Sequence, residues 1–184
     1  MNSMRVLCFG DSNTYGHDPR SYFGGRYPAI SRWVDLLAEK TGWDVINAGE
    51  NGREIPRSPV LLPPVDLLIV MLGSNDLLQK ASAAAVTARM EAFIHLLPLA
   101  ENRIILIAPP PMQPGTWVTE ERLLTESLQL AQRYRTLAQQ LGIHFSDAGD
   151  WNISLSYDGV HFTEEGHKSF AAGLYEALSR INFE

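Results

Sequence analysis

Two almost uninterrupted apolar runs, 66–72 and 103–108, constrain the fold of this chain more than any other feature of its sequence. A strand that is apolar along its whole length has to be covered on both faces. Such coverage is typical of a parallel sheet with helices on each side. Three shorter strand-like segments, 5–9, 45–48 and 143–147, bring the expected number of strands to five.

Helix-like segments fill the gaps between these strands. Apolar residues recur at the i, i+4, i+7 spacing of a core-facing helix over 86–97. Further helices are expected before Gly42, before Gly142 and after Thr163, because glycine favours helix ends and threonine favours helix starts. The alternation predicts an α/β fold, and the absence of a repeat or linker predicts a single domain over 1–184.

The bulk composition argues against several classes of protein. A formal net charge of −6 disfavours nucleic-acid and membrane-surface partners, and no apolar run approaches the length of a membrane span. Cys8, the single cysteine, cannot form an internal disulfide and is expected to be a buried, unreactive thiol. Because residues 1–5 lack the apolar core of a signal peptide, the sequence predicts a cytoplasmic protein.

Polar segments follow the predicted strands at five places. Loops at the carboxyl ends of parallel strands open on one side of the sheet, where ligands bind. We therefore expect these segments to converge, although they are far apart in the chain. They are Gly10-Asp11-Ser12-Asn13, Asn47-Ala48-Gly49-Glu50-Asn51-Gly52, Gly73-Ser74-Asn75-Asp76, Pro109-Pro110-Pro111-Met112 and Asp158-Gly159-Val160-His161.

The chemistry of these segments predicts an esterase site. A serine hydroxyl is a poor nucleophile until a histidine accepts its proton and a carboxylate orients that histidine. Ser12 is the candidate nucleophile, His161 the general base and Asp158 the orienting acid. The backbone N–H groups of Ser12 and Gly52 and the side-chain amide of Asn75 are candidate oxyanion donors.

Each motif also has an ordinary interpretation. Gly10–Asn13, Gly73–Asp76 and Asp158-Gly159 are all rich in turn-forming residues, and only their joint order along the chain is informative. His161 and His167 lack the spacing and partners of a zinc site. No phosphate-binding loop is present, so neither a metal nor another cofactor is expected.

These four blocks, at Ser12, Gly52, Asn75 and His161, resemble the SGNH hydrolases, or GDSL-type lipase/esterase superfamily. The stretches 8–16 and 158–163 are similar to its arylesterase/acyltransferase branch. The resemblance implies a three-layer α/β/α flavodoxin-like fold with the four residues in the namesake roles. It also implies Asp158 as the third triad member and leaves a homo-oligomer possible.

The chain departs from the family pattern in two places. Asn13 stands where leucine is usual after the nucleophile, which changes the polarity beside Ser12 but removes no required group. Glu50 and Asn51 make the second block more polar than expected. Gly49 therefore competes with Gly52 as the backbone oxyanion donor.

The predicted rim of the cleft suggests the substrate class. Aromatic walls with few charges suit small neutral acyl esters, including aryl esters, and an arginine there could hold an acidic leaving group. A carbohydrate O-acetylesterase and an acyltransferase are alternatives on the same site. A non-catalytic flavodoxin-like module for a nucleotide or flavin is a remote one, because Asp11 would repel a phosphate. The predicted substrate-binding residues are Tyr15, His17, Arg53, Met112 and Trp117.

Overall fold

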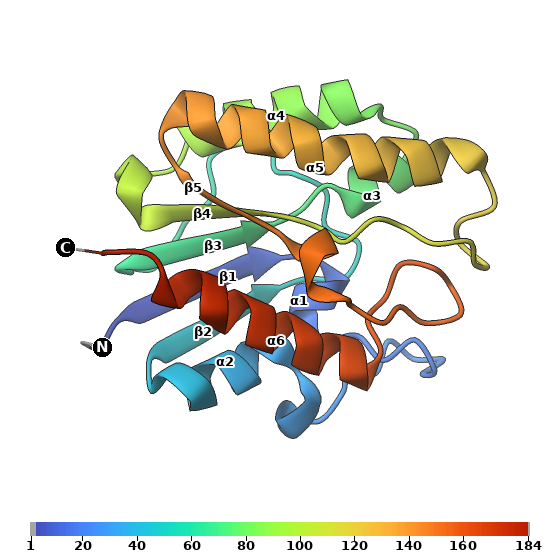
Figure 1. Cartoon of the computed structure of the whole chain (residues 1–184), viewed down its shortest axis with the longest axis horizontal. Helices are drawn as coiled ribbons and strands as arrows, with labels where there is room; N and C mark the ends of the chain where they lie inside the picture. The colour runs from blue at the N-terminus through green and yellow to red at the C-terminus, as the bar shows by residue number, and fades with distance from the viewer. Residues whose placement is uncertain (1–2, 184) are drawn as a thin grey trace.

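Five parallel strands form the central sheet of the protein (Figure 1), as the apolar runs predicted. The computed structural model describes residues 3–183. Met1, Asn2 and Glu184, the ends of the predicted domain, lie outside the described residues. The strands are β1 (Arg5–Gly10), β2 (Asp44–Gly49), β3 (Leu67–Met71), β4 (Ile104–Ala108) and β5 (His144–Asp147).

Helices cover both faces of this sheet, so the three-layer α/β/α fold is confirmed. The α-helices are α1 (Ser12–Tyr15), α2 (Trp33–Thr41), α3 (Ser74–Leu78), α4 (Ala83–His95), α5 (Glu121–Leu141) and α6 (Glu164–Ser179). Figure 1 shows α3, α4 and α5 on one face and α2 and α6 on the other. The short 3₁₀ helices are η1 (Ala29–Ser31), η2 (Glu101–Arg103) and η3 (Ala148–Trp151).

Strand β1 shows how the sequence builds two cores. Successive side chains of a strand point to opposite faces. Leu7 and Phe9 accordingly pack into the core beneath α4 and α5, while Val6 and Cys8 pack into the core beneath α2 and α6. Cys8 is fully buried, as predicted, and burial raises the pKa of its thiol well above the ordinary value.

The longer helices begin and end where the sequence predicted. Gly42 and Gly142 follow α2 and α5 with φ of 68° and 69°, left-handed conformations that glycine adopts without strain. The Thr163 side chain accepts a hydrogen bond from the backbone N–H of Gly166 at the start of α6. The segments at Ser12 and Ser74, which are rich in turn-forming residues, start the short helices α1 and α3 directly after β1 and β3.

The strand order β2-β1-β3-β4-β5 places a topological switch beside β1. The chain leaves β1 toward β2 on one side and later enters β3 on the other, so the following segments diverge around a crevice. Gly10 pairs with Gly49 of β2 and with Met71 of β3, so the three strands end at one level. Between residues 3 and 183, no helix is both long and apolar enough to cross a membrane.

Candidate active site

Ser12 is the first residue of α1 and lies at the crevice between β1 and β3. The Asp11 side chain caps this helix by accepting a hydrogen bond of 2.9 Å from the backbone N–H of Asn13. Gly16 ends the helix after one turn, at φ 93°. Asp11 is therefore a capping residue, as expected for an acidic side chain in this type of turn.

The structure brings together the three residues predicted as the triad. Ser12 Oγ lies 2.9 Å from His161 Nε2, and His161 Nδ1 lies 2.7 Å from Asp158 Oδ2. The other carboxylate oxygen, Asp158 Oδ1, accepts hydrogen bonds from the backbone N–H groups of Val160 and His161, each at 2.9 Å. The spacing of three between Asp158 and His161 thus lets one carboxylate hold both the ring and the turn that carries it.

These contacts keep Asp158 ionised. Burial by itself would raise the pKa of Asp158, but hydrogen bonds from the His161 ring, from the His161 N–H and from the Val160 N–H outweigh burial. The pKa of Asp158 therefore lies well below its ordinary value. A carboxylate that stays charged in this position can stabilise a positive charge on the His161 ring.

Two other side chains and one loop contact the His161 ring or the turn that carries it. The His161 ring lies against His17, with ring centroids 4.7 Å apart, and edge-on to Trp117, at 5.0 Å. The backbone N–H of Trp117 donates to the Asp158 carbonyl at 3.1 Å, and that of Gln113 donates to the Gly159 carbonyl at 3.0 Å. The loop after β4 is thus hydrogen-bonded, backbone to backbone, to the turn that carries Asp158.

The geometry separates the two glycines that compete as the backbone donor. The N–H of Gly49 donates to Asn47 Oδ1 at 2.9 Å. A Cβ atom on Gly49 would lie 2.0 Å from the Tyr15 nitrogen, so this glycine permits the close packing of β2 on α1. Gly52, at φ 75°, lines the cavity beside Ser12. Within residues 3–183 the Gly52 N–H has no hydrogen-bond partner, so it is free to donate to a bound molecule.

Asn75 lies in the first turn of α3, across the crevice from Ser12. Its Nδ2 donates to the Arg53 carbonyl at 3.1 Å and lies 3.5 Å from Asp11 Oδ2. Burial raises the pKa of Asp11 to about 6, against the lowering effect of the hydrogen bond from the Asn13 N–H. The hydrogen bond to the Arg53 carbonyl fixes the orientation of the Asn75 side-chain amide, and Asn75 lines the cavity beside Ser12.

A cavity of about 420 Å³ opens in front of Ser12. Its lining residues come from the loops after β1 and β2, from α3, and from the loops that carry Trp117 and His161. They are Ser12, His17, Asn51, Gly52, Asn75, Leu78, Gln79, Trp117 and His161.

Only two of the predicted substrate-binding residues, His17 and Trp117, line this cavity. Met112 is buried in the core beneath α5 because its backbone turns inward to bond Ser127. The Tyr15 ring lies under the Arg26 guanidinium, at 4.5 Å.

Arg53 also lies outside the cavity lining. Its guanidinium donates to the Gly10 and Ala48 carbonyls and to the Glu50 carboxylate. It thereby clamps the ends of β1 and β2, and the expectation that it holds a leaving group is not supported.

The sequence reasoning missed four residues of the site. Asn51 is the neighbour of Gly52. Leu78 and Gln79 lie one helical turn after Asn75, so they share its face only because this segment forms the helix α3. The fourth, Asp76, is 1% exposed.

Asp76 joins the segment that follows Gly52 to the helix that carries Asn75. Its Oδ2 accepts the Ile55 backbone N–H at 3.1 Å, and its Oδ1 pairs with Arg89 Nη1 at 2.9 Å. The carboxylate thereby holds the loop that follows Gly52 beside the helix that carries Asn75.

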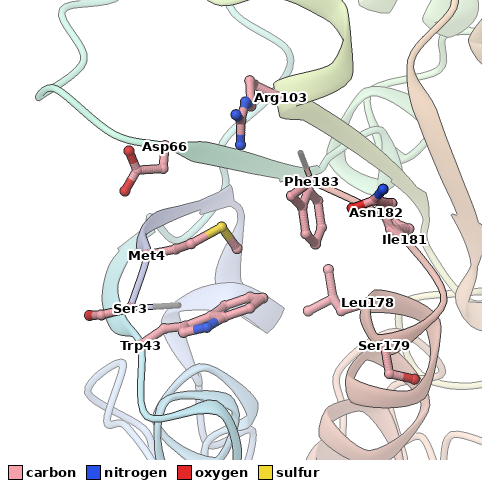
Figure 2. A pocket seen from close by; sticks show the side chains of 10 residues that line it. All are labelled: Ser3, Met4, Trp43, Asp66, Arg103, Leu178, Ser179, Ile181, Asn182 and Phe183. Atoms are coloured by element: carbon pink, nitrogen blue, oxygen red, sulfur yellow. The ribbon is translucent and has the colours of Figure 1, made fainter. Parts of the chain in front are cut away.

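A second cavity, of about 430 Å³, lies at the opposite edge of the sheet, where the strands begin. Figure 2 shows the side chains of Met4, Trp43, Leu178 and Phe183 around it, with the Arg103 side chain extending toward them from η2. No histidine is among the described residues that line it. Among residues 3–183, no cluster of histidine, cysteine and carboxylate side chains could hold a metal ion.

Comparison with known protein families identifies the family of this chain. The model of the GDSL-like lipase/acylhydrolase family matches residues 8–169, a span that contains Ser12, Gly52, Asn75, Asp158 and His161. The chain belongs to this family. This GDSL-family chain is an esterase, a hydrolase of carboxylic esters.

Solved structures and curated relatives of this GDSL-family esterase agree with that assignment. The aryl esterase of M. smegmatis is 25% identical and has a TM-score of 0.83, with 98% of this chain and 100% of that one covered. A carbohydrate acetylesterase family member from Sinorhizobium meliloti is 27% identical, with a TM-score of 0.80 and coverages of 96% and 98%. The human isoamyl acetate-hydrolyzing esterase 1 homolog is 25% identical, over 96% of this chain and 82% of its own length.

Proposed function

We propose that this esterase cleaves small carboxylic esters through an acyl-enzyme formed on Ser12. The observation that carries the proposal is the continuous hydrogen-bonded chain from Ser12 Oγ through the His161 ring to Asp158, at 2.9 Å and 2.7 Å. Nucleophile, base and orienting acid at such distances are the arrangement that acyl transfer requires.

In the first half of the reaction, Ser12 Oγ attacks the ester carbonyl carbon while His161 Nε2 takes the hydroxyl proton. Asp158 stabilises the imidazolium that forms, because its own pKa is held low. The tetrahedral intermediate collapses, the alcohol leaves with the proton from His161, and the acyl group stays on Ser12. In the second half, His161 activates a water molecule, which releases the carboxylic acid and restores the hydroxyl.

The negative charge on the carbonyl oxygen needs donors in place before the reaction. We propose three: the N–H of Ser12, the N–H of Gly52 and the side-chain amide of Asn75. Support comes from the unpartnered N–H of Gly52 in the described chain and from the position of Asn75, whose side chain lines the cavity together with Ser12 and Gly52. The N–H of Gly49 is the weaker candidate, because Asn47 already accepts it.

The cavity favours a small and neutral substrate. Its volume, about 420 Å³, is near the lower end for small-molecule sites, and none of its lining side chains is a lysine, arginine, aspartate or glutamate. Trp117 and Leu78 offer apolar surface to an aryl or short acyl group. The names of the aryl esterase and isoamyl acetate esterase relatives support the same class.

An acetylated carbohydrate is the second candidate, because Asn51 and Gln79 add polar side chains to the lining and a carbohydrate acetylesterase is a structural neighbour. The ratio of kcat/KM for p-nitrophenyl acetate to that for an acetylated sugar separates the two. Acyl transfer is measured in the same assay by adding an alcohol acceptor. A cytoplasmic location, a single domain and a possible homo-oligomer stay predictions of the sequence.

The mechanism is tested at its nucleophile. A fluorophosphonate is expected to label Ser12 in the wild-type protein, and Ser12→Ala should abolish both labelling and turnover while the circular dichroism spectrum stays unchanged. Ser82→Ala, which removes a serine at the start of α4, is the control and should keep both. Turnover by Ser12→Ala at the wild-type rate would rule out the acyl-enzyme.

A further inference from the structure

Asn13 links the turn that carries the nucleophile to the turn that carries the base. Its side chain is 5% exposed and lies between two segments far apart in the sequence. Asn13 Nδ2 donates to the Val160 carbonyl at 3.1 Å, and Asn13 Oδ1 accepts from the Phe162 N–H at 2.9 Å. One amide therefore bonds to the backbone on both sides of His161.

The backbone of Asn13 is fixed as well. Its N–H donates to Asp11 Oδ1 at 2.9 Å, and its carbonyl accepts from Trp33 Nε1 at 2.9 Å. Since Asn13 is the neighbour of Ser12 in α1, the position of its side chain is set by the same turn that presents the hydroxyl.

We propose that Asn13 is a positioning residue that sets the distance between Ser12 Oγ and His161 Nε2. The inference rests on the proposed function. The two hydrogen bonds of the Asn13 side chain fix the backbone at His161 relative to the backbone at Ser12. The 2.9 Å contact between Ser12 Oγ and His161 Nε2 is therefore already formed before substrate binds.

The other contacts of the base turn do not replace this link. Asp158 and the loop around Trp117 hold the turn to itself and to the segment after β4, neither of which carries the nucleophile. The Tyr27 hydroxyl also reaches the turn, donating to the Phe162 carbonyl at 3.3 Å, but Tyr27 lies outside α1. Among residues 3–183, Asn13 is the residue of the nucleophile turn whose side chain bonds to the backbone beside His161.

The amide chemistry of Asn13 is specific for this task. One side has to donate to a carbonyl and the other has to accept from an N–H, and a short side-chain amide supplies both in one plane. Leucine has nearly the same shape and supplies neither. Asn13→Leu therefore removes both bonds while it keeps the number and branching of the side-chain heavy atoms, although its two methyl groups occupy more space than the planar amide.

The test measures the reactivity of each intact site. Wild-type protein and Asn13→Leu are titrated with a fluorophosphonate, which gives the number of labelled sites per chain and the rate of labelling. In Asn13→Leu we expect the number of sites to stay at the wild-type value. The labelling rate and kcat for p-nitrophenyl acetate should both fall about tenfold to hundredfold, the cost of a small misplacement of reacting groups. KM should stay within about twofold, because no lining residue of the cavity changes.

A purely structural role predicts another pattern, in which fewer sites are labelled and each remaining site reacts at the wild-type rate. That pattern, or a wild-type rate with all sites present, would overturn the inference. Thr14→Val is the matched control on the same helix. Thr14 is 1% exposed and its Oγ1 has no partner in the described chain, so its labelling rate should equal that of the wild type.

Two further outcomes are distinguishable. If Asn13→Leu does not fold, Asn13→Ser is measured in the same way, because serine keeps a hydroxyl but is too short to reach both backbone groups. If the wild-type protein is not labelled at Ser12, the proposed function itself fails. A labelled wild type with an equally fast Asn13→Leu removes only the role of Asn13.

Discussion

The two edges of the sheet carry cavities of nearly the same volume, about 420 Å³ where the strands end and about 430 Å³ where they begin. The cavity at the carboxyl edge holds a serine, a histidine and free or oriented N–H donors. The cavity at the amino edge is walled by Met4, Trp43, Leu178 and Phe183, with Arg103 beside them (Figure 2).

The difference lies in how the buried polar groups are used. At the carboxyl edge, Asp158 accepts hydrogen bonds from the His161 ring and from two backbone N–H groups, and these bonds hold the His161 ring and its turn together. Buried polar atoms without a partner in the described chain occur at both edges, the indole N–H of Trp43 at the amino edge and His17 Nδ1 at the carboxyl edge. Cavity volume therefore does not distinguish the two edges, whereas the hydrogen-bonded chain from Ser12 through His161 to Asp158 is found at the carboxyl edge.

The largest expected effect is a loss of kcat on substitution of Asn75 at the carboxyl edge, for which the described residues at the amino edge offer no counterpart. Asn75→Ala removes one proposed oxyanion donor at the carboxyl edge, and we expect kcat to fall about 10²–10³-fold. Asn75→Asp is the matched variant, because it keeps the shape of the side chain and cannot donate once ionised; its loss should be at least as large. Steady-state kinetics with p-nitrophenyl acetate measure both, and wild-type kcat in either variant would remove Asn75 from the oxyanion site.

A smaller effect is expected from His167, which lies in α6 and makes the free energy of unfolding depend on pH. His167 is fully buried, and its Nδ1 accepts from the Trp33 N–H at 3.3 Å. Burial, aided by the positive charge of Arg32, lowers the pKa of His167 to about 3. Below pH 6.5 the unfolded chain therefore binds a proton that the folded chain excludes.

The contribution of His167 to stability is thus complete above about pH 6.5 and declines as the pH falls toward 3, by up to about 1.4 kcal/mol per pH unit. His167→Asn keeps an acceptor at the Nδ1 position and does not titrate. Urea unfolding of both proteins between pH 7 and pH 4 is the measurement, and their stability difference should shrink as the pH falls. Parallel curves for the two proteins would contradict the assignment.

The smallest effect is expected at the amino edge. Arg103→Ala changes a partly exposed side chain beside the second cavity, far from Ser12, and should alter stability by no more than about 0.5 kcal/mol. Its kcat/KM should equal the wild-type value. A tenfold change in kcat/KM would break the comparison, because it would connect the amino-edge cavity to the reaction.

Much of the fold followed from local patterns. The apolar runs at β3 and β4 predicted buried parallel strands, and Gly42, Gly142 and Thr163 predicted helix ends, because these signals depend on neighbouring residues alone. The helices α1 and α3 were not predicted, because both are short and consist of turn-forming residues. Only α1 carries a local helix signal, the capping side chain of Asp11, whereas α3 begins without a side-chain cap.

The substrate-binding residues show the same division. Tyr15, Arg53 and Met112 were expected at the cleft from their types and loop positions, yet the backbone directs them to other partners. Leu78 and Gln79 carry no chemical signal of their own and face the cavity because α3 is a helix. Where a side chain points depends on the backbone conformation, which sequence position does not supply.

The sequence by itself determined the layered fold, the family and the residues predicted for the triad, because strand and helix periodicity and the order of the motifs can be read from the chain without knowing how it packs. Only the tertiary structure showed that the N–H of Gly49 has a partner while that of Gly52 has none in the described chain, and revealed Asn13 and Asp76 as links between separate segments. Those outcomes depend on which backbone N–H and carbonyl groups already have partners. Such pairing exists only after distant parts of the chain have packed together.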